Sequence, residues 1–192
     1  MDKLRDRWAG QSLGEEIANA ATHGVGAGLA IAGLTVLVVL ATLNGTAIHI
    51  VSLAIYGSTL VLLYLASTIY HAIQHSRAKA VLNILDHAAI FLLIAGTYTP
   101  FTLVAMGGVV GWTLFVVVWA MAVAGVLFKV FHHHHGDRVS VILYLAMGWL
   151  VIVAIGEVWA SVGLGGFLWL LIGGLAYSLG VIFFVWERMP YN

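Results

Sequence analysis

Polar residues recur at helical spacing in an apolar segment near the N-terminus. Glu16, Asn19 and His23 stand at positions i, i+3 and i+7, which places all three on one face of a helix. Carboxylate, amide and imidazole groups are costly inside an apolar span, so such a stripe predicts a buried polar network. For Glu16 alone, a favourable position near a helix N-terminus is an equally good explanation.

A second stripe holds the strongest candidate for a metal ligand. Ser67, His71 and His75 stand at positions i, i+4 and i+8, again on one helix face. Imidazole is a good zinc ligand, and a catalytic zinc takes three protein ligands and a water. Asp86 opens the next apolar segment and could orient a ligand or accept a proton from a zinc-bound water, which Ser67 could hydrogen-bond. His75 lies close to Arg77, and we favour an interfacial role for it.

Other arrangements of these residues, and other residues, offer alternatives. Both stripes could form a hydrogen-bonded network that only fixes helix packing. His49 lies at the other end of its apolar segment, and the four histidines at 132–135 are typical of a solvated loop. Neither a Gly-rich phosphate loop nor a G-x-S-x-G elbow occurs in the sequence.

The composition indicates that these polar residues belong to an integral membrane protein. Of the 192 residues, 62% are hydrophobic and 8% are charged, whereas a soluble domain carries about 25% charged residues. The formal net charge of zero argues against a nucleic-acid partner, and the lack of Cys excludes disulfides, thiolate zinc sites and cysteine nucleophiles. We therefore predict an all-α integral membrane protein, a single membrane domain over residues 1–192, with membrane lipids as its partners.

The charged residues divide this domain into six predicted transmembrane helices. No Asp, Glu, Lys or Arg occurs over residues 17–76 or 87–128, and each run is long enough for two spans of about 20 residues. Turn signals at Asn44-Gly45-Thr46, Met106-Gly107-Gly108 and the Gly-rich stretch 161–166 separate neighbouring spans. The predicted spans are 17–43, 48–75, 81–105, 109–131, 139–160 and 165–186.

The basic residues predict how these helices are oriented. Lys129 and Arg138 flank the loop after the fourth span, and the other six Lys and Arg residues precede the first span or follow the second or sixth span. The positive-inside rule therefore places the N-terminus in the cytoplasm. Both polar stripes and Asp86 then lie in the cytoplasmic leaflet, contributed by three different helices.

Three segments identify a family resemblance. Residues 16–24 (EIANAATHG), 67–71 (STIYH) and 85–90 (LDHAAI, continuing into AGTYTP at 95–100) resemble the hemolysin III family, the bacterial branch of the progestin and adipoQ receptor superfamily. The resemblance covers nearly the whole chain. It implies a seven-helix bundle in the bacterial cytoplasmic membrane with a cytoplasmic N-terminus.

The resemblance also implies a zinc site. It assigns His71 as one ligand and places two more on an H-x-x-x-H motif of the seventh helix. Asp86 would lie by the zinc-bound water, with Ser67 nearby, as the catalytic residues; Glu16, Asn19 and His23 would form the supporting polar network. The sequence reaches Asn192 where the seventh helix is expected to begin, which indicates either truncation or a degenerate member.

Three functions are consistent with this sequence. The first is a zinc-dependent lipid hydrolase, acting on an amide as ceramidase-like relatives do. The second is a cytolytic or channel-forming protein, as the family name implies, and the third is a membrane-homeostasis sensor with structural zinc. The Gly24–Gly28 spacing favours close helix packing, with a homo-oligomer interface as the alternative.

Overall fold

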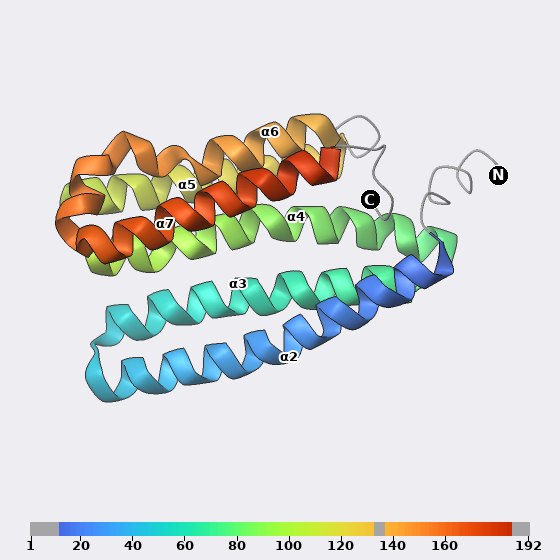
Figure 1. Ribbon diagram of the computed structural model, residues 1–192, viewed down its shortest axis with the longest axis horizontal. Coiled ribbons are helices and arrows are strands. Elements are labelled where there is room, and N and C mark those ends of the chain that lie inside the picture. The colour runs from blue at the N-terminus through green and yellow to red at the C-terminus, as the bar shows by residue number, and fades with distance from the viewer. Residues whose placement is uncertain (1–11, 133–136, 186–192) are drawn as a thin grey trace.

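A computed structural model of the chain describes residues 12–132 and 137–185. Its helices are α2 (Leu13–Asn44), α3 (Ala47–Ala72), α4 (Ser76–Pro100), α5 (Gly108–Phe131), α6 (Asp137–Gly148) and α7 (Ile155–Val185), with a π-helix, η1 (Phe101–Met106), and a 3-10 helix, η2 (Leu150–Ala154). Figure 1 shows α2 and α3 as a pair on one side of α4, with α5, α6 and α7 on the other side.

Capping residues and glycines mark the points where the helices begin and end. Ser12 caps α2 through a capping box with Glu15, in which each side chain bonds the other residue's backbone N–H. Gly45 ends α2, and α3 begins at Ala47. Gly107, at φ +59°, separates η1 from α5, and this left-handed conformation favours glycine.

Five helical stretches within the described residues are long and apolar enough to cross a membrane: 13–44, 47–72, 76–106, 108–131 and 139–183. The prediction of six separate spans is therefore wrong as a count of helices. The predicted span 139–160 and most of the predicted span 165–186 fall within one helical stretch of 45 residues, 139–183. The first four predicted spans each correspond to one observed stretch.

The physical reason is that two helical segments meet at a kink at Gly163, with no separate loop between them. Only Gly163, at φ +61° and ψ −171°, departs from helical geometry there. The two halves of the stretch lie side by side, because the Trp149 indole N–H donates to the Ser178 hydroxyl at 3.0 Å. Figure 1 shows the chain reversing direction between η2 and the second half of α7.

The core lies between α4, α5 and α6. It centres on Phe91, which has no exposed surface, and on the Tyr144 ring, whose centroid lies 4.4 Å from that of Phe91. Gly125 of α5 allows the close approach of Phe91, since a Cβ at this position would meet the Phe91 ring. The other core residues are Ile94, Ala95, Val118, Ala122 and Met147.

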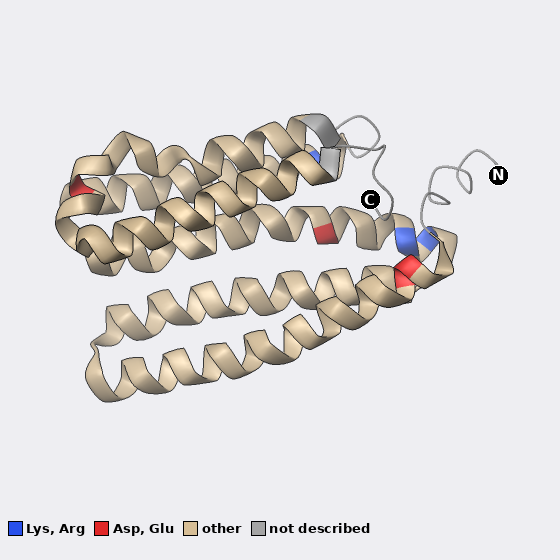
Figure 2. Cartoon of the chain, viewed as in Figure 1, with Lys and Arg blue, Asp and Glu red and all other residues tan. Residues whose placement is uncertain are grey.

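Charged positions gather at one end of the bundle. Figure 2 shows them where α2 begins, where α4 begins and where α5 ends, with another acidic position part of the way along α4 and one at the opposite end of the bundle. The sides of the helices between these ends expose many large apolar side chains, such as Leu29, Val116 and Ile172. An apolar flank of this kind matches a lipid surround.

We expect Gly125→Ala to lower the midpoint of thermal unfolding in detergent, because overpacking a filled core costs about 1–3 kcal/mol. Gly28→Ala is the matched control: it is also a helical glycine, but a Cβ there meets nothing within 4 Å. The control should not lower the midpoint. Equal midpoints for the two variants would contradict the packing described for Phe91.

Candidate metal-binding site

Three helix termini meet at the charged end of the bundle. The capping box at Ser12 starts α2 one turn before Glu16, so that Glu16 lies in a regular helix. His71 lies in the last turn of α3, and Lys79 lies in the first turn of α4. Only three residues separate α3 from α4, so these two side chains are held at the same depth.

A buried carboxylate joins the three helices. The two oxygens of Glu16 have different partners: Oε1 lies 2.6 Å from Nζ of Lys79, and Oε2 lies 2.7 Å from Nδ1 of His71. All three side chains are 10% exposed or less. Charged side chains are buried to this extent only when paired, and here each charge has a partner.

Two aromatic rings pack against the His71 imidazole. The His23 ring stacks on it with centroids 5.6 Å apart and an angle of 26°, and the Tyr70 ring meets it edge-on at 4.7 Å. Nδ1 of His23 lies 2.7 Å from the Asn19 carbonyl oxygen. The packing leaves the two imidazoles little freedom to rotate.

A second polar pair lies beside this cluster. The hydroxyl of buried Ser67 hydrogen-bonds to the carboxylate of Asp86. Asp86 also interacts electrostatically with His23, His71 and His87. Asp86 is half-buried.

The structure therefore brings five predicted site residues together: Glu16, His23, Ser67, His71 and Asp86. Asn19, the sixth, contributes its backbone carbonyl to His23, and Asn19 itself is half-buried.

The remaining candidates lie elsewhere. His75 is exposed and is the N-cap of α4, accepting a 3.5 Å hydrogen bond from the Ala78 N–H. His49 lies near the start of α3, at the opposite end of that helix from His71, with Nδ1 2.9 Å from the Thr46 hydroxyl. Of the histidines at 132–135, the last three lie outside the described residues.

Sequence reasoning did not find Lys79. Its charge was used only to orient the spans, because a basic residue near a membrane end is the usual topological signal. Its spacing of seven residues from Asp86, on the same face of α4, was the available signal that it points into the bundle. Its burial was not predictable from sequence, since it requires Glu16 of another helix.

The cluster fits one zinc ligand and its support. Metal-bound histidines usually donate their second ring N–H to a carboxylate or carbonyl, and the Glu16–His71 pair has this arrangement. Within residues 12–132 and 137–185, no group of three His, Cys, Asp or Glu side chains is arranged to hold a metal ion. A complete three-ligand site requires donors from outside these ranges.

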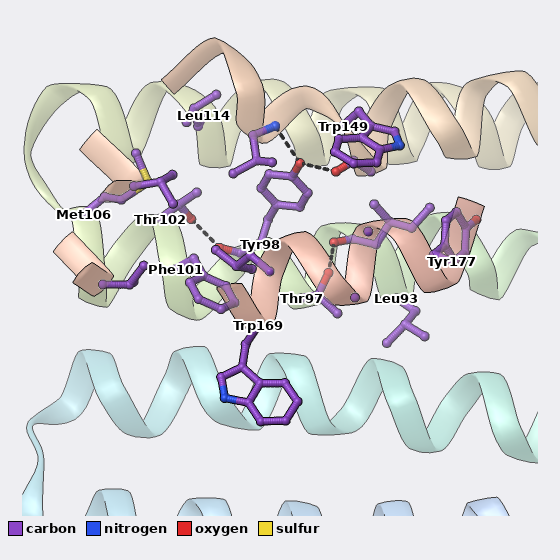
Figure 3. A pocket seen from close by; sticks show the side chains of 18 residues that line it. Leu93, Thr97, Tyr98, Phe101, Thr102, Met106, Leu114, Trp149, Trp169 and Tyr177 are labelled. Atoms are coloured by element: carbon purple, nitrogen blue, oxygen red, sulfur yellow. Dashed lines mark hydrogen bonds between the residues drawn. The ribbon is translucent and has the colours of Figure 1, made fainter. Parts of the chain in front are cut away.

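An apolar cavity of about 360 Å³ lies further along the bundle, between α4, η1, α5, η2 and α7. Figure 3 shows Tyr98 at its centre, with Thr97, Phe101, Trp149 and Tyr177 among the lining residues. The Tyr98 hydroxyl donates to the Met147 carbonyl at 2.9 Å and accepts from the Val151 N–H at 2.8 Å. These bonds hold the start of η2 against α4.

Long apolar helices with a polar cluster at one end define a multi-pass membrane protein. The chain matches the family model described as "Haemolysin-III related" over residues 11–191. It therefore belongs to the hemolysin III family, and the resemblance inferred from its motifs is confirmed.

Relatives extend from bacteria to mammals. The chain is 47% identical to "Hemolysin-3" of Bacillus cereus over 182 residues, which cover 95% of this chain and 83% of the relative. It is 46% identical to "Hemolysin-3 homolog" of Bacillus subtilis (strain 168), over 94% of this chain and 85% of the relative. The human "Monocyte to macrophage differentiation factor" is 27% identical over 135 residues, 68% of this chain and 56% of the relative. No solved structure matches the chain.

We expect Glu16→Ala to destabilise the protein by about 3–5 kcal/mol, because it leaves the buried Lys79 ammonium without its carboxylate. Glu157→Ala, which removes an exposed acidic side chain from α7, is the control and should change stability by less than about 0.5 kcal/mol. Thermal unfolding in detergent measures both. Equal effects would show that the Glu16 contacts are energetically unimportant.

Proposed function

We propose that this protein is a zinc-dependent hydrolase of membrane lipids, with an amide as the bond it cleaves, as in ceramidase-like enzymes. The observation that supports this most is the buried Glu16–His71 pair, at 2.7 Å. A histidine backed by a carboxylate is the arrangement that metal sites use to orient an imidazole and raise its basicity. The remaining ligands would come from a seventh helix, outside the described residues.

Each polar residue of the site would have its own role in this reaction. Bound zinc would supply a Lewis acid and lower the pKa of a water molecule. Asp86 would accept and return protons as the general base and acid, and Ser67 would fix the orientation of the Asp86 carboxylate by its hydrogen bond. His71 would hold the metal through Nε2, while Glu16 keeps Nδ1 occupied.

The apolar cavity supports a lipid as the substrate. Its volume of about 360 Å³ lies in the range of ligand pockets, and its lining is mainly aliphatic and aromatic. Leu93, the lining residue that is nearest to Asp86 in the sequence, lies about 10 Å along α4 from it by helix rise. A hydrocarbon chain in the cavity would leave a polar headgroup near the Asp86 carboxylate.

This function requires a defined topology. We propose that the stretch 139–183 crosses the membrane twice, because its 45 residues extend about 68 Å by helix rise, more than twice a hydrocarbon core of about 30 Å. The break at Gly163 and the Trp149–Ser178 hydrogen bond support a reversal there. With six crossings, the positive-inside rule would put the N-terminus and the polar cluster on the cytoplasmic side.

Reporter fusions test this topology. We expect external reporter activity for fusions after Asn44, Gly107 and Gly163, and cytoplasmic activity for a fusion after Gln74. The fusion after Gly163 is decisive for the stretch 139–183. Cytoplasmic activity there would mean that the stretch crosses once, and external activity after Gln74 would reverse the whole orientation.

Metal analysis of the protein with its seventh helix present tests the site. We expect one zinc per chain, lost in His71→Ala, because His71 is the ligand that α3 supplies. Asp86→Ala should retain more zinc but lose hydrolysis, since a carboxylate beside a metal-bound water acts mainly on its protons. His75→Ala, at the exposed N-cap of α4, is the control and should retain both zinc and activity. Zinc at one per chain in His71→Ala would disprove the site.

The second candidate function is cytolysis, which the name of the Bacillus cereus relative favours. A pore would conduct ions in liposomes whether or not metal is present, whereas the hydrolase would release a fatty acid and stop on chelation. Purified protein measured in both assays decides between them. Conductance that persists after chelation, without lipid hydrolysis, would replace the hydrolase proposal with the pore.

A further inference from the structure

Lys79 is a buried cation that contacts a carboxylate, a backbone carbonyl and an aromatic ring. It is 4% exposed, and its Nζ donates to the Tyr70 carbonyl at 3.3 Å as well as to Glu16. The same ammonium lies 4.7 Å from the centroid of the Tyr70 ring. Its position is thus fixed from two other helices, α2 through Glu16 and α3 through Tyr70.

The Glu16 carboxylate contacts Lys79 through one of its two equivalent oxygens and His71 through the other. Oε1 pairs with Lys79, and Oε2 is directed at the imidazole, 2.7 Å from Nδ1. A carboxylate oxygen accepts hydrogen bonds, so Nδ1 must carry the proton of a neutral imidazole. Nε2 is then the nitrogen with a free lone pair.

We propose that Lys79 is a positioning residue for the metal ligand His71. Its ion pair holds the Glu16 carboxylate in the one orientation that fixes the proton of His71 on Nδ1 and presents Nε2 as the ligand atom. This inference rests on the proposed function for its metal role. Lys79 itself touches neither a metal nor a substrate.

A purely structural role for Lys79 predicts a different result. If Lys79 only neutralised buried charge, its loss would lower stability without changing which nitrogen of His71 is protonated. The tautomer of His71 is therefore the property that separates positioning from stabilisation. Stacked His23 and edge-on Tyr70 would still hold the ring plane after Lys79 is replaced, so the proton position can respond alone.

The first experiment uses ¹⁵N NMR of the metal-free, histidine-labelled protein in detergent, with His71→Ala to assign the signals. We expect protonated Nδ1 and unprotonated Nε2 for His71 in the wild type. Lys79→Met should give a mixture of tautomers, Lys79→Arg should restore the wild-type spectrum, and Arg77→Met, an exposed basic neighbour, should leave it unchanged. A wild-type His71 with its proton on Nε2, or a Lys79→Met spectrum identical to wild type, would overturn the proposal.

The second experiment measures zinc affinity in the protein with its seventh helix present. Loss of a residue that supports a ligand typically costs about 10- to 100-fold in affinity, and we expect this loss for Lys79→Met but not for Arg77→Met. Tight wild-type binding that Lys79→Met leaves unchanged would overturn the role of Lys79 alone. A wild type that binds no zinc would overturn the proposed function and the metal role of Lys79 with it, whatever the NMR result.

Discussion

The Glu16 carboxylate is the group on which the arrangement of the first three described helices depends. A charge placed away from water is costly, and it persists only where partners meet it on every side. Glu16 finds one partner on α3, His71, and one on α4, Lys79. Both contacts exist only when α2 begins, α3 ends and α4 begins at the same depth, so this ion pair specifies the register of the three helices.

Beyond the polar cluster, the rest of the bundle is mainly apolar. The core between α4, α5 and α6 is built from apolar side chains around Phe91. This core holds α4 in place, and α4 carries Asp86. Asp86 therefore projects from a rigid helix, one and a half turns before the buried core begins at Phe91. Beyond this core, the cavity around Tyr98 is apolar, so the polar end and the apolar cavity form two environments along one helix.

Much of this fold follows from where the charges stand in the sequence. Long runs without charge predict the first four spans, and the turns at 44–46 and 106–108 follow from Asn and Gly, which suit tight turns. The stretch 139–183 was not predictable in the same way, because a segment rich in Gly reads as a loop although only Gly163 departs from helical geometry. The stripes on α2 and α3 correctly group Glu16 with His71 at one depth. Lys79 was missed because its charge was used only to orient the spans, and its burial depends on Glu16 of another helix.

The most direct test of this account is a double-mutant cycle between Glu16 and Lys79, measured by thermal unfolding of Glu16→Ala, Lys79→Met and the double variant in one detergent. If the carboxylate and the ammonium hold the three helices together, the double variant loses less stability than the sum of the single variants, with a coupling above about 1 kcal/mol. Strictly additive losses would contradict the account, because they would mean that the two residues stabilise the bundle independently.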